Sequence, residues 1–159
     1  MSTLNNKTIL ITGGTGSFGK KFTKLTLENH NPKKIIIFSR DEMKQWNMAE
    51  KYQQFDLEGK IEYVIGDVRD KERLHRVIEG VDFIVHAAAT KIVPTAEYNP
   101  FECIKTNVNG AMNVIEVAIE QKVEKLSPLA QIRPATPSIY TVPQSSLLTS
   151  CSLPRTCTQ

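Results

Sequence analysis

Four glycines fall within seven residues near the start of the chain, in the segment TGGTGSFG at Thr12–Gly19. Three of them have GxxGxxG spacing between a β-branched run and a segment with helical apolar spacing. A backbone that turns tightly against a phosphate needs residues without a Cβ, and a helix N-terminus presents N–H groups to an anion. This context favours a pyrophosphate-binding loop over an ordinary glycine-rich turn, and the missing GK[ST] ending argues against a nucleoside-triphosphate loop. The predicted contact residues are Gly13, Thr15, Gly16, Ser17, Phe18 and Gly19.

The second β-branched run, KIIIFS, ends in a hydroxyl and is followed by two cations, where the ribose of a dinucleotide would lie. An NAD site normally has an acidic residue here, which accepts hydrogen bonds from the ribose 2′-hydroxyl. A guanidinium suits the 2′-phosphate of NADP instead. We therefore expect NADP, although Arg40 and Lys44 also fit a plain solvated helix start, and Asp41 is more simply a helix cap than a displaced acid. The residues predicted at this end are Ser39, Arg40, Asp41 and Lys44.

The ends of the third and fourth β-branched runs supply the remaining residues of the predicted cofactor site. Asp67 could accept a hydrogen bond from the adenine amine, with Val68 packed on the ring, or Asp67 could simply cap the next helix. Ala87 and Ala88 belong to a run of small residues that would let the nicotinamide side lie against the backbone, or that only packs in the core. Three other residues are expected to pack rather than react: His86, Trp46 and Cys103.

The elements that must position these residues alternate between short β-branched runs and segments of helical apolar spacing. Such alternation is typical of βαβ units and a parallel sheet. We expect an α/β, Rossmann-like, doubly wound parallel sheet that is truncated after its fourth strand–helix unit, with the ligand crevice at the carboxyl ends of the strands. The predicted strands are 7–12, 34–39, 61–66 and 81–88, and the predicted helices are 18–28, 41–53, 70–79 and 99–121.

Composition limits the class of protein. The 159 residues suffice for one domain, and the net charge of +3 comes without a basic block, so neither nucleic acid nor a membrane is an expected partner. No apolar run approaches the roughly 18 residues of a membrane helix. Three cysteines without CxxC spacing and a start without a signal-peptide pattern favour a cytoplasmic protein with reduced thiols and no metal site.

The composition changes abruptly after Lys125. All eight glycines and all seventeen acidic residues precede Leu126, whereas five of the eight prolines follow it. Proline interrupts sheet ladders, so these residues are not expected to supply a fifth strand, which would leave strand four at an exposed sheet edge. We therefore divide the chain into an incomplete NADP-binding Rossmann domain at 1–125 and a non-native or disordered tail at 126–159.

The residues together resemble the extended short-chain dehydrogenase/reductase family, and more narrowly the inverting UDP-N-acetylglucosamine 4,6-dehydratases of bacterial surface-sugar and pseudaminic acid pathways. The resemblance covers residues 1–125 and rests on the segments TGGTGSFG, SRDEMK, GDVRD, AAATKIVPTAE and NPFECIKTN, with Thr90 standing where a larger apolar residue is expected. It implies NADP in the opening loop, UDP-N-acetylglucosamine beside the nicotinamide, and a homo-oligomeric full-length enzyme. It also implies that Lys91 lies near both cofactor and sugar, and that Asn107 helps to order the site.

Such dehydratases carry their acid–base residues after the fifth strand, as Thr-Asp-Lys and then Tyr-x-x-x-Lys, and neither motif stands at 126–150 here. Tyr140 is followed four residues later by Gln144. With one base restored after the Lys125 codon, however, the codons of the tail regroup to V-I-A-L-S-T-D-K and later to Y-G-A-T-K. We assign no catalytic residue, expect this chain to lack dehydratase turnover, and attribute the tail to a frameshift or a sequencing error rather than to a native extension.

Two other functions stay open at this point. The chain could be a non-catalytic dinucleotide-binding module, or another nucleotide-sugar epimerase or reductase on the same scaffold. A binding module has no reason to carry a hidden Tyr-x-x-x-Lys, and the segments SRDEMK and NPFECIKTN favour a dehydratase over an epimerase.

Overall fold

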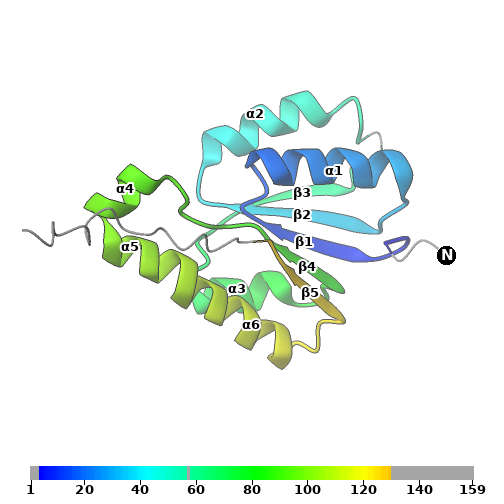
Figure 1. The fold of residues 1–159 in the computed structure, drawn as a ribbon. Coiled ribbons are helices and arrows are strands. Elements are labelled where there is room, and N and C mark those ends of the chain that lie inside the picture. The colour runs from blue at the N-terminus through cyan, green and yellow to red at the C-terminus, as the bar shows by residue number, and fades with distance from the viewer. Residues whose placement is uncertain (1–3, 57, 130–159) are drawn as a thin grey trace, which may run out of the picture.

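The computed structural model describes residues 4–56 and 58–129, and Figure 1 shows their arrangement as a sheet between two layers of helices. Tyr140, Gln144 and the rest of residues 130–159 lie outside the described residues. The sheet has five parallel strands in the order β3-β2-β1-β4-β5. The strands are β1 (Thr8–Thr12), β2 (Lys34–Ser39), β3 (Ile61–Ile65), β4 (Phe83–His86) and β5 (Lys125–Pro128). The predicted α/β, Rossmann-like class is confirmed.

The helices cover both faces of the sheet, which explains the continuous apolar runs of the inner strands. They are α1 (Ser17–Asn29), α2 (Glu42–Tyr52), α3 (Lys71–Ile78), α4 (Val93–Tyr98), α5 (Pro100–Ile104) and α6 (Gly110–Glu120), with one π-helical turn, η1 (Lys105–Asn109), between the last two. Figure 1 places α1 and α2 on one face, and α3 and α6 on the other. In the part of the chain that the structure describes, none of these helices is long and apolar enough to cross a lipid bilayer.

Two apolar cores follow from the alternation of side chains along each strand. Leu10, Ile36 and Ile84 pack with residues of α3 and α6, among them Leu74 and Val114. Their neighbours on the opposite face, Ile9, Ile11, Ile35, Ile37 and Val85, pack with residues of α1 and α2. Strands β1, β2 and β4 are therefore packed on both faces, which makes the carboxyl edge at their ends a rigid support for a site.

The expectation that the sheet stops after four strands is wrong, because Lys125–Pro128 forms β5 beside β4. The register pairs Ile84 with Leu126, and the N–H of Leu129 donates to the carbonyl of His86 at 2.8 Å. Leu126 also packs against the core under α3 and α6. A parallel neighbour needs matching backbone groups rather than β-branched residues, and proline is tolerated at an outer strand. Strand β5 therefore runs across the compositional boundary.

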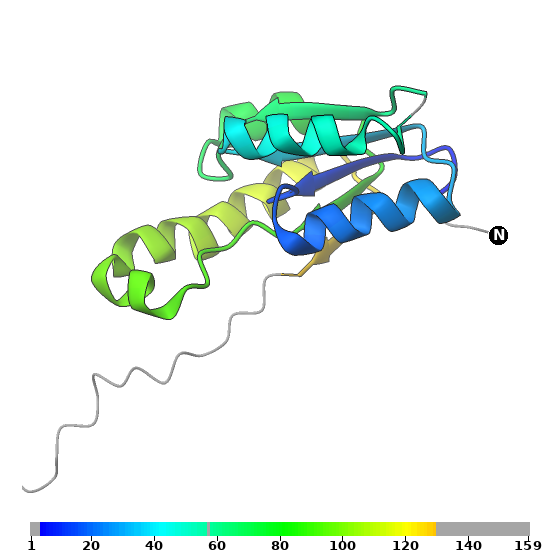
Figure 2. The same cartoon turned by 90° about the horizontal axis from the view of Figure 1, so that it is seen from above.

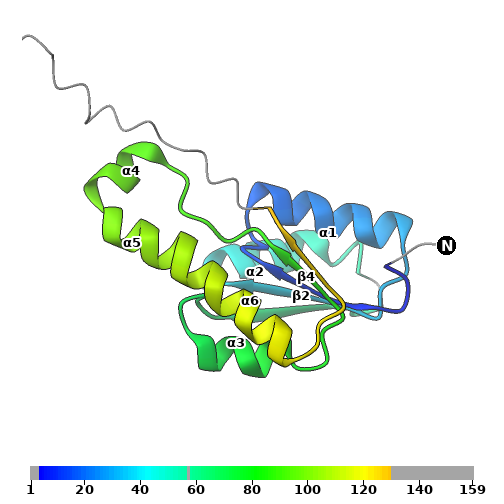
Figure 3. The same ribbon diagram turned by 60° about the horizontal axis from the view of Figure 1, so that its bottom comes forward.

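The predicted helix over 99–121 is divided in the structure. It consists of α5, η1 and α6, and the π turn is marked by the hydrogen bond from the N–H of Gly110 to the carbonyl of Lys105. The shorter helix α4 before it was not predicted. Figures 2 and 3 show α4 and α5 extending past the carboxyl ends of the strands, so this arm borders the edge where the site was expected.

Helices α2 and α3 each begin with an aspartate whose side chain caps the first turn. The side chains of Asp41 and Asp70 accept from the N–H groups of Lys44 and Arg73, which confirms Asp41 as a cap.

Trp46 does not pack as expected, since it is 63% exposed. The buried face of α2 carries Gln45 and Met48, and a residue next to Gln45 on a helix points about 100° away from it.

Candidate functional site

A cavity of about 570 Å³ opens at the carboxyl ends of β1, β2, β3 and β4. It gathers predicted residues from four separate stretches of the sequence. The predicted residues that line it are Gly13, Thr15, Gly16, Ser39, Arg40, Asp41, Lys44, Asp67, Val68, Ala87, Ala88 and Lys91. Ser17, Phe18 and Gly19 belong to the first turn of α1 and are not among its lining residues. The cavity thus brings together most of the site predicted from sequence.

The glycine loop is the part of the site with the tightest steric limits. Gly13 has a φ of +66°, and a Cβ there would lie 2.8 Å from the Cα of Ala88. A Cβ on Gly19 would lie 2.3 Å from the carbonyl oxygen of Gly14. Helix α1 begins after Gly16 with no side-chain cap, unlike α2 and α3. Its first N–H groups are therefore left without a capping side chain, as a phosphate-binding helix start requires.

The end of β2 supplies hydroxyl, amide and charged groups to the cavity. Ser39 is buried, and its hydroxyl and carbonyl both accept from the Nε2 of Gln45, at 3.1 and 3.2 Å. Asp41 is engaged by Lys44, through the backbone N–H at 2.9 Å and the ammonium at 2.7 Å. The hydrogen bond from the Lys44 side chain is the first cause that holds the pKa of Asp41 below its ordinary value. Asp41 is therefore an ionised carboxylate that is paired with Lys44 at the end of β2.

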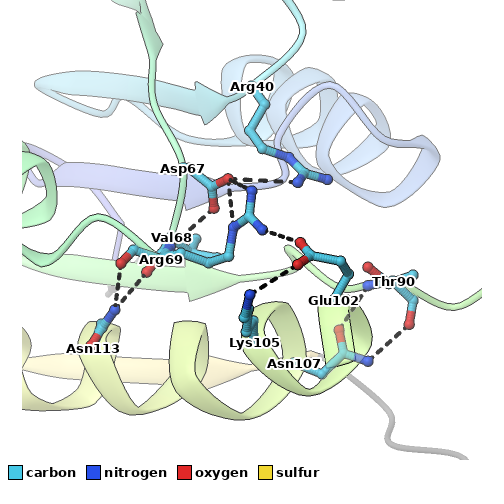
Figure 4. A network of polar contacts seen from close by, with 9 residues as sticks. All are labelled: Arg40, Asp67, Val68, Arg69, Thr90, Glu102, Lys105, Asn107 and Asn113. Atoms are coloured by element: carbon cyan, nitrogen blue, oxygen red, sulfur yellow. Dashed lines mark hydrogen bonds and ion pairs between the residues drawn. The ribbon is translucent and has the colours of Figure 1, made fainter. Parts of the chain in front are cut away.

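Asp67 lies at the centre of a polar network that Figure 4 shows. Its carboxylate accepts from the backbone N–H of Arg69 at 3.0 Å and from the Arg69 guanidinium at 2.9 and 2.7 Å, while Arg40 lies at 3.6 Å. The other side of Arg69 binds Glu102, which also pairs with Lys105 at 3.1 Å. Burial alone would raise the pKa of Asp67, but hydrogen bonds from Arg69 and the charges of Arg69 and Arg40 outweigh it and lower that pKa.

The end of β4 is fixed by hydrogen bonds from neighbouring elements. The Nδ1 of His86 lies 2.7 Å from the hydroxyl of Thr12, which also lies 3.4 Å from the N–H of Ala88. His86 is 3% exposed, and burial lowers its pKa, so it is a core residue as predicted.

On the other side of this strand end, Asn107 in η1 accepts from the N–H of Thr90 at 2.7 Å and donates to its carbonyl at 2.9 Å. Asn107 thus holds the loop that leads to Lys91.

Sequence reasoning missed Gln45, Arg69 and Glu102. Arg69 and Glu102 are 33 residues apart in the sequence, so no local sequence pattern predicts their contact. Arg69 could have been found from GDVRD, because an arginine two residues after a carboxylate is within reach of it. Gln45 carries a weaker signal, as a polar residue on the face of α2 that also holds Met48.

Three comparisons place this geometry among known proteins. The family described as polysaccharide biosynthesis protein matches residues 9–137. An inverting UDP-N-acetylglucosamine 4,6-dehydratase of Campylobacter jejuni is 56% identical over 133 residues, which are 84% of this chain and 39% of the relative. Among solved structures, Pen from Bacillus thuringiensis has a TM-score of 0.74 and 39% identity, over 80% of this chain and 38% of that one. DesIV, a dTDP-glucose 4,6-dehydratase from Streptomyces venezuelae with NAD bound, has a TM-score of 0.66 and 27% identity, over 75% of this chain and 38% of that one. The chain spans about two fifths of the length of these relatives.

Replacing Asn107 with alanine should destabilise the fold by about 1–3 kcal/mol, because it leaves both backbone groups of Thr90 without their partner. The measurement is urea unfolding followed by circular dichroism, together with hydrogen exchange at the Thr90 amide. The exposed Asn109, two residues further along η1, provides the control substitution Asn109→Ala. Unchanged exchange at Thr90 in Asn107→Ala would show that the loop is held by other contacts.

Proposed function

The chain belongs to the polysaccharide biosynthesis protein family, and from this premise we propose that its described part is the NADP-binding portion of a UDP-N-acetylglucosamine 4,6-dehydratase that inverts the sugar at C5. The observation that carries the proposal is the cavity at the strand ends, in which the glycine loop, the cations after β2 and the small residues after β4 meet. UDP-N-acetylglucosamine is the proposed substrate, and the full-length enzyme is proposed to be a homo-oligomer.

The residues of the cavity fit a dinucleotide. A Cβ at Gly13 or Gly19 would collide with the backbone of Ala88 or Gly14, so only glycine allows the loop to turn this tightly. Helix α1 starts without a side-chain cap, so its first backbone N–H groups are available to a pyrophosphate. Arg40 is 58% exposed in its side chain, so its guanidinium is open to an anion at the ribose end. When bound, NADP would supply the acceptance and return of a hydride that a 4,6-dehydration of the sugar requires.

The roles of the remaining residues follow from where they lie. Ser39, Arg40 and Lys44 would bind the 2′-phosphate, and Asp67 and Val68 would contact the adenine. The backbone after β4, held by Asn107, would support the nicotinamide end through Ala87 and Ala88, with Lys91 directed to the sugar nucleotide.

The acid–base chemistry is proposed to lie elsewhere. Removing the proton of the C4 hydroxyl needs a base, and eliminating water across C5–C6 needs an acid–base set. Four of the ionisable groups that line the cavity form two ion pairs, Arg40 with Asp67 and Lys44 with Asp41. These groups suit binding rather than proton transfer. We therefore propose that the described residues bind and orient, and that the catalytic residues belong to the regrouped reading frame.

A non-catalytic dinucleotide-binding module would share the same cavity and the same cofactor preference. The regrouped frame favours an interrupted dehydratase over such a module, since a module does not require Thr-Asp-Lys or Tyr-x-x-x-Lys.

Arg40→Gln should weaken NADPH binding by about tenfold or more and leave NADH binding nearly unchanged, because only NADPH carries the 2′-phosphate that the guanidinium would bind. Dissociation constants for both nucleotides, measured by isothermal titration calorimetry at fixed salt, test this. Arg76→Gln removes an equal charge from the last turn of α3 and serves as the control. Equal affinity of the unaltered chain for NADPH and NADH would contradict the assignment of NADP.

The 159-residue chain should show no dehydratase turnover, because its own reading frame lacks the acid–base residues. A coupled assay for a 4-keto-6-deoxy sugar from UDP-N-acetylglucosamine measures this, and formation of that product would refute it.

The gene itself provides an independent test of the frame. One base added after the Lys125 codon should make the following codons read Val-Ile-Ala-Leu-Ser-Thr-Asp-Lys, and later Tyr-Gly-Ala-Thr-Lys. A nucleotide sequence whose codons do not regroup in this way would establish the tail as the native reading.

A further inference from the structure

The carboxylate of Asp67 is shared unequally between two arginines. Arg69 approaches it with three N–H groups at 3.0, 2.9 and 2.7 Å, whereas Arg40 makes a single contact at 3.6 Å. The Arg40 side chain is 58% exposed and that of Arg69 is 35% exposed. Arg69 is therefore the main counter-ion of Asp67, and Arg40 keeps most of its donors directed elsewhere (Figure 4).

Arg69 is itself held on both sides. Its Nη1 donates to Glu102 in α5, while its Nε and Nη2 face Asp67. Lys105 pairs with the other oxygen of Glu102 at 3.1 Å, so Glu102 is also fixed. A guanidinium bound between two carboxylates is oriented before any ligand arrives and is not free to move to a phosphate.

This arrangement matters because a carboxylate beside a phosphate site is unfavourable. An anion bound by Arg40 would lie close to Asp67, since the two side chains are only 3.6 Å apart. An uncompensated Asp67 would repel a 2′-phosphate and would also draw Arg40 toward itself. A 2′-hydroxyl carries no charge and would be affected much less.

We propose that Arg69 determines the preference of this site for a 2′-phosphorylated dinucleotide, by neutralising Asp67 and leaving Arg40 to the phosphate. The inference rests on the proposed function, because it requires that the cavity bind a dinucleotide. Arg69 acts through Asp67 and Arg40, so it is a positioning residue.

The test compares dissociation constants for NADPH and NADH in the 159-residue chain and its variants. Arg69→Gln should reduce the ratio of NADPH to NADH affinity by about tenfold, because one unscreened charge near a dianion has an effect of this order. Arg69→Lys keeps the charge and should retain most of the preference. Asp67→Asn combined with Arg69→Gln removes the repelling carboxylate and should restore the ratio, even though both affinities fall together if an adenine contact is lost.

The controls separate electrostatics from folding. Arg76→Gln removes an equal charge from α3 and should not change the ratio. Each variant is compared with the unaltered chain by far-ultraviolet circular dichroism, and Arg69→Lys carries the test if Arg69→Gln loses its helical signal. In that case, a ratio in Arg69→Lys that falls as far as in Arg40→Gln would refute the proposal.

The outcomes distinguish this inference from the proposed function. Equal losses of NADPH and NADH affinity in Arg69→Gln would show a purely structural role for Arg69 and overturn the inference alone. A failure of the double variant to restore the ratio would also overturn it. If the unaltered chain binds neither nucleotide, both the proposed function and the inference are wrong.

Discussion

The contact between the glycine loop and the end of β4 is the constraint on which the rest of the site depends. The backbone at Gly13 turns with positive φ and passes so close to Ala88 that no Cβ fits between them. Strand β1 pairs with β2 on one side and β4 on the other, so this contact lies at the point where the strand order reverses. Ligands of open α/β sheets bind at that point. The residues on both sides of this backbone contact, Gly13 and Ala88, line the cavity, so the contact fixes two of its walls relative to each other.

Each of the two carboxylates that line the cavity is paired with a cation. Asp41 and Asp67 both face a region that an anionic ligand would occupy, and each is neutralised by a cation close in sequence, Lys44 and Arg69. Pairs this exposed contribute little to the stability of the fold. Their consequence is local: each places a cation beside the carboxylate, which would weaken its repulsion of the proposed phosphate, and Arg40 keeps only a long contact with Asp67. The same residues therefore cap helices or close turns and also set the electrostatics of the site.

Much of this fold could be predicted from sequence because its signals are local. Apolar runs of β-branched residues gave four strands, and glycine spacing gave the loop, since a missing Cβ can be read directly from the sequence. The features that were missed depend on contacts between distant segments. Arg69 contacts Glu102 only because the fold brings α5 next to the loop after β3. The π turn that carries Asn107 has no recognisable sequence pattern. Trp46 is exposed because neighbours on α2, rather than its own apolarity, determine which face is buried.

Strand β5 shows that the change in composition after Lys125 does not interrupt the sheet at residues 126–128. Its position requires backbone groups in register with β4 and one apolar side chain facing the core, and Leu126 meets the second condition. Under the proposed shift of frame, the regrouped residues Val-Ile-Ala-Leu would meet both conditions as well, so the same sheet edge would form in either frame. An acid–base set is different, because it needs particular side chains at particular positions. The proposed shift of one base at this point would therefore keep the parallel pairing and would change only the side chains that the chemistry needs.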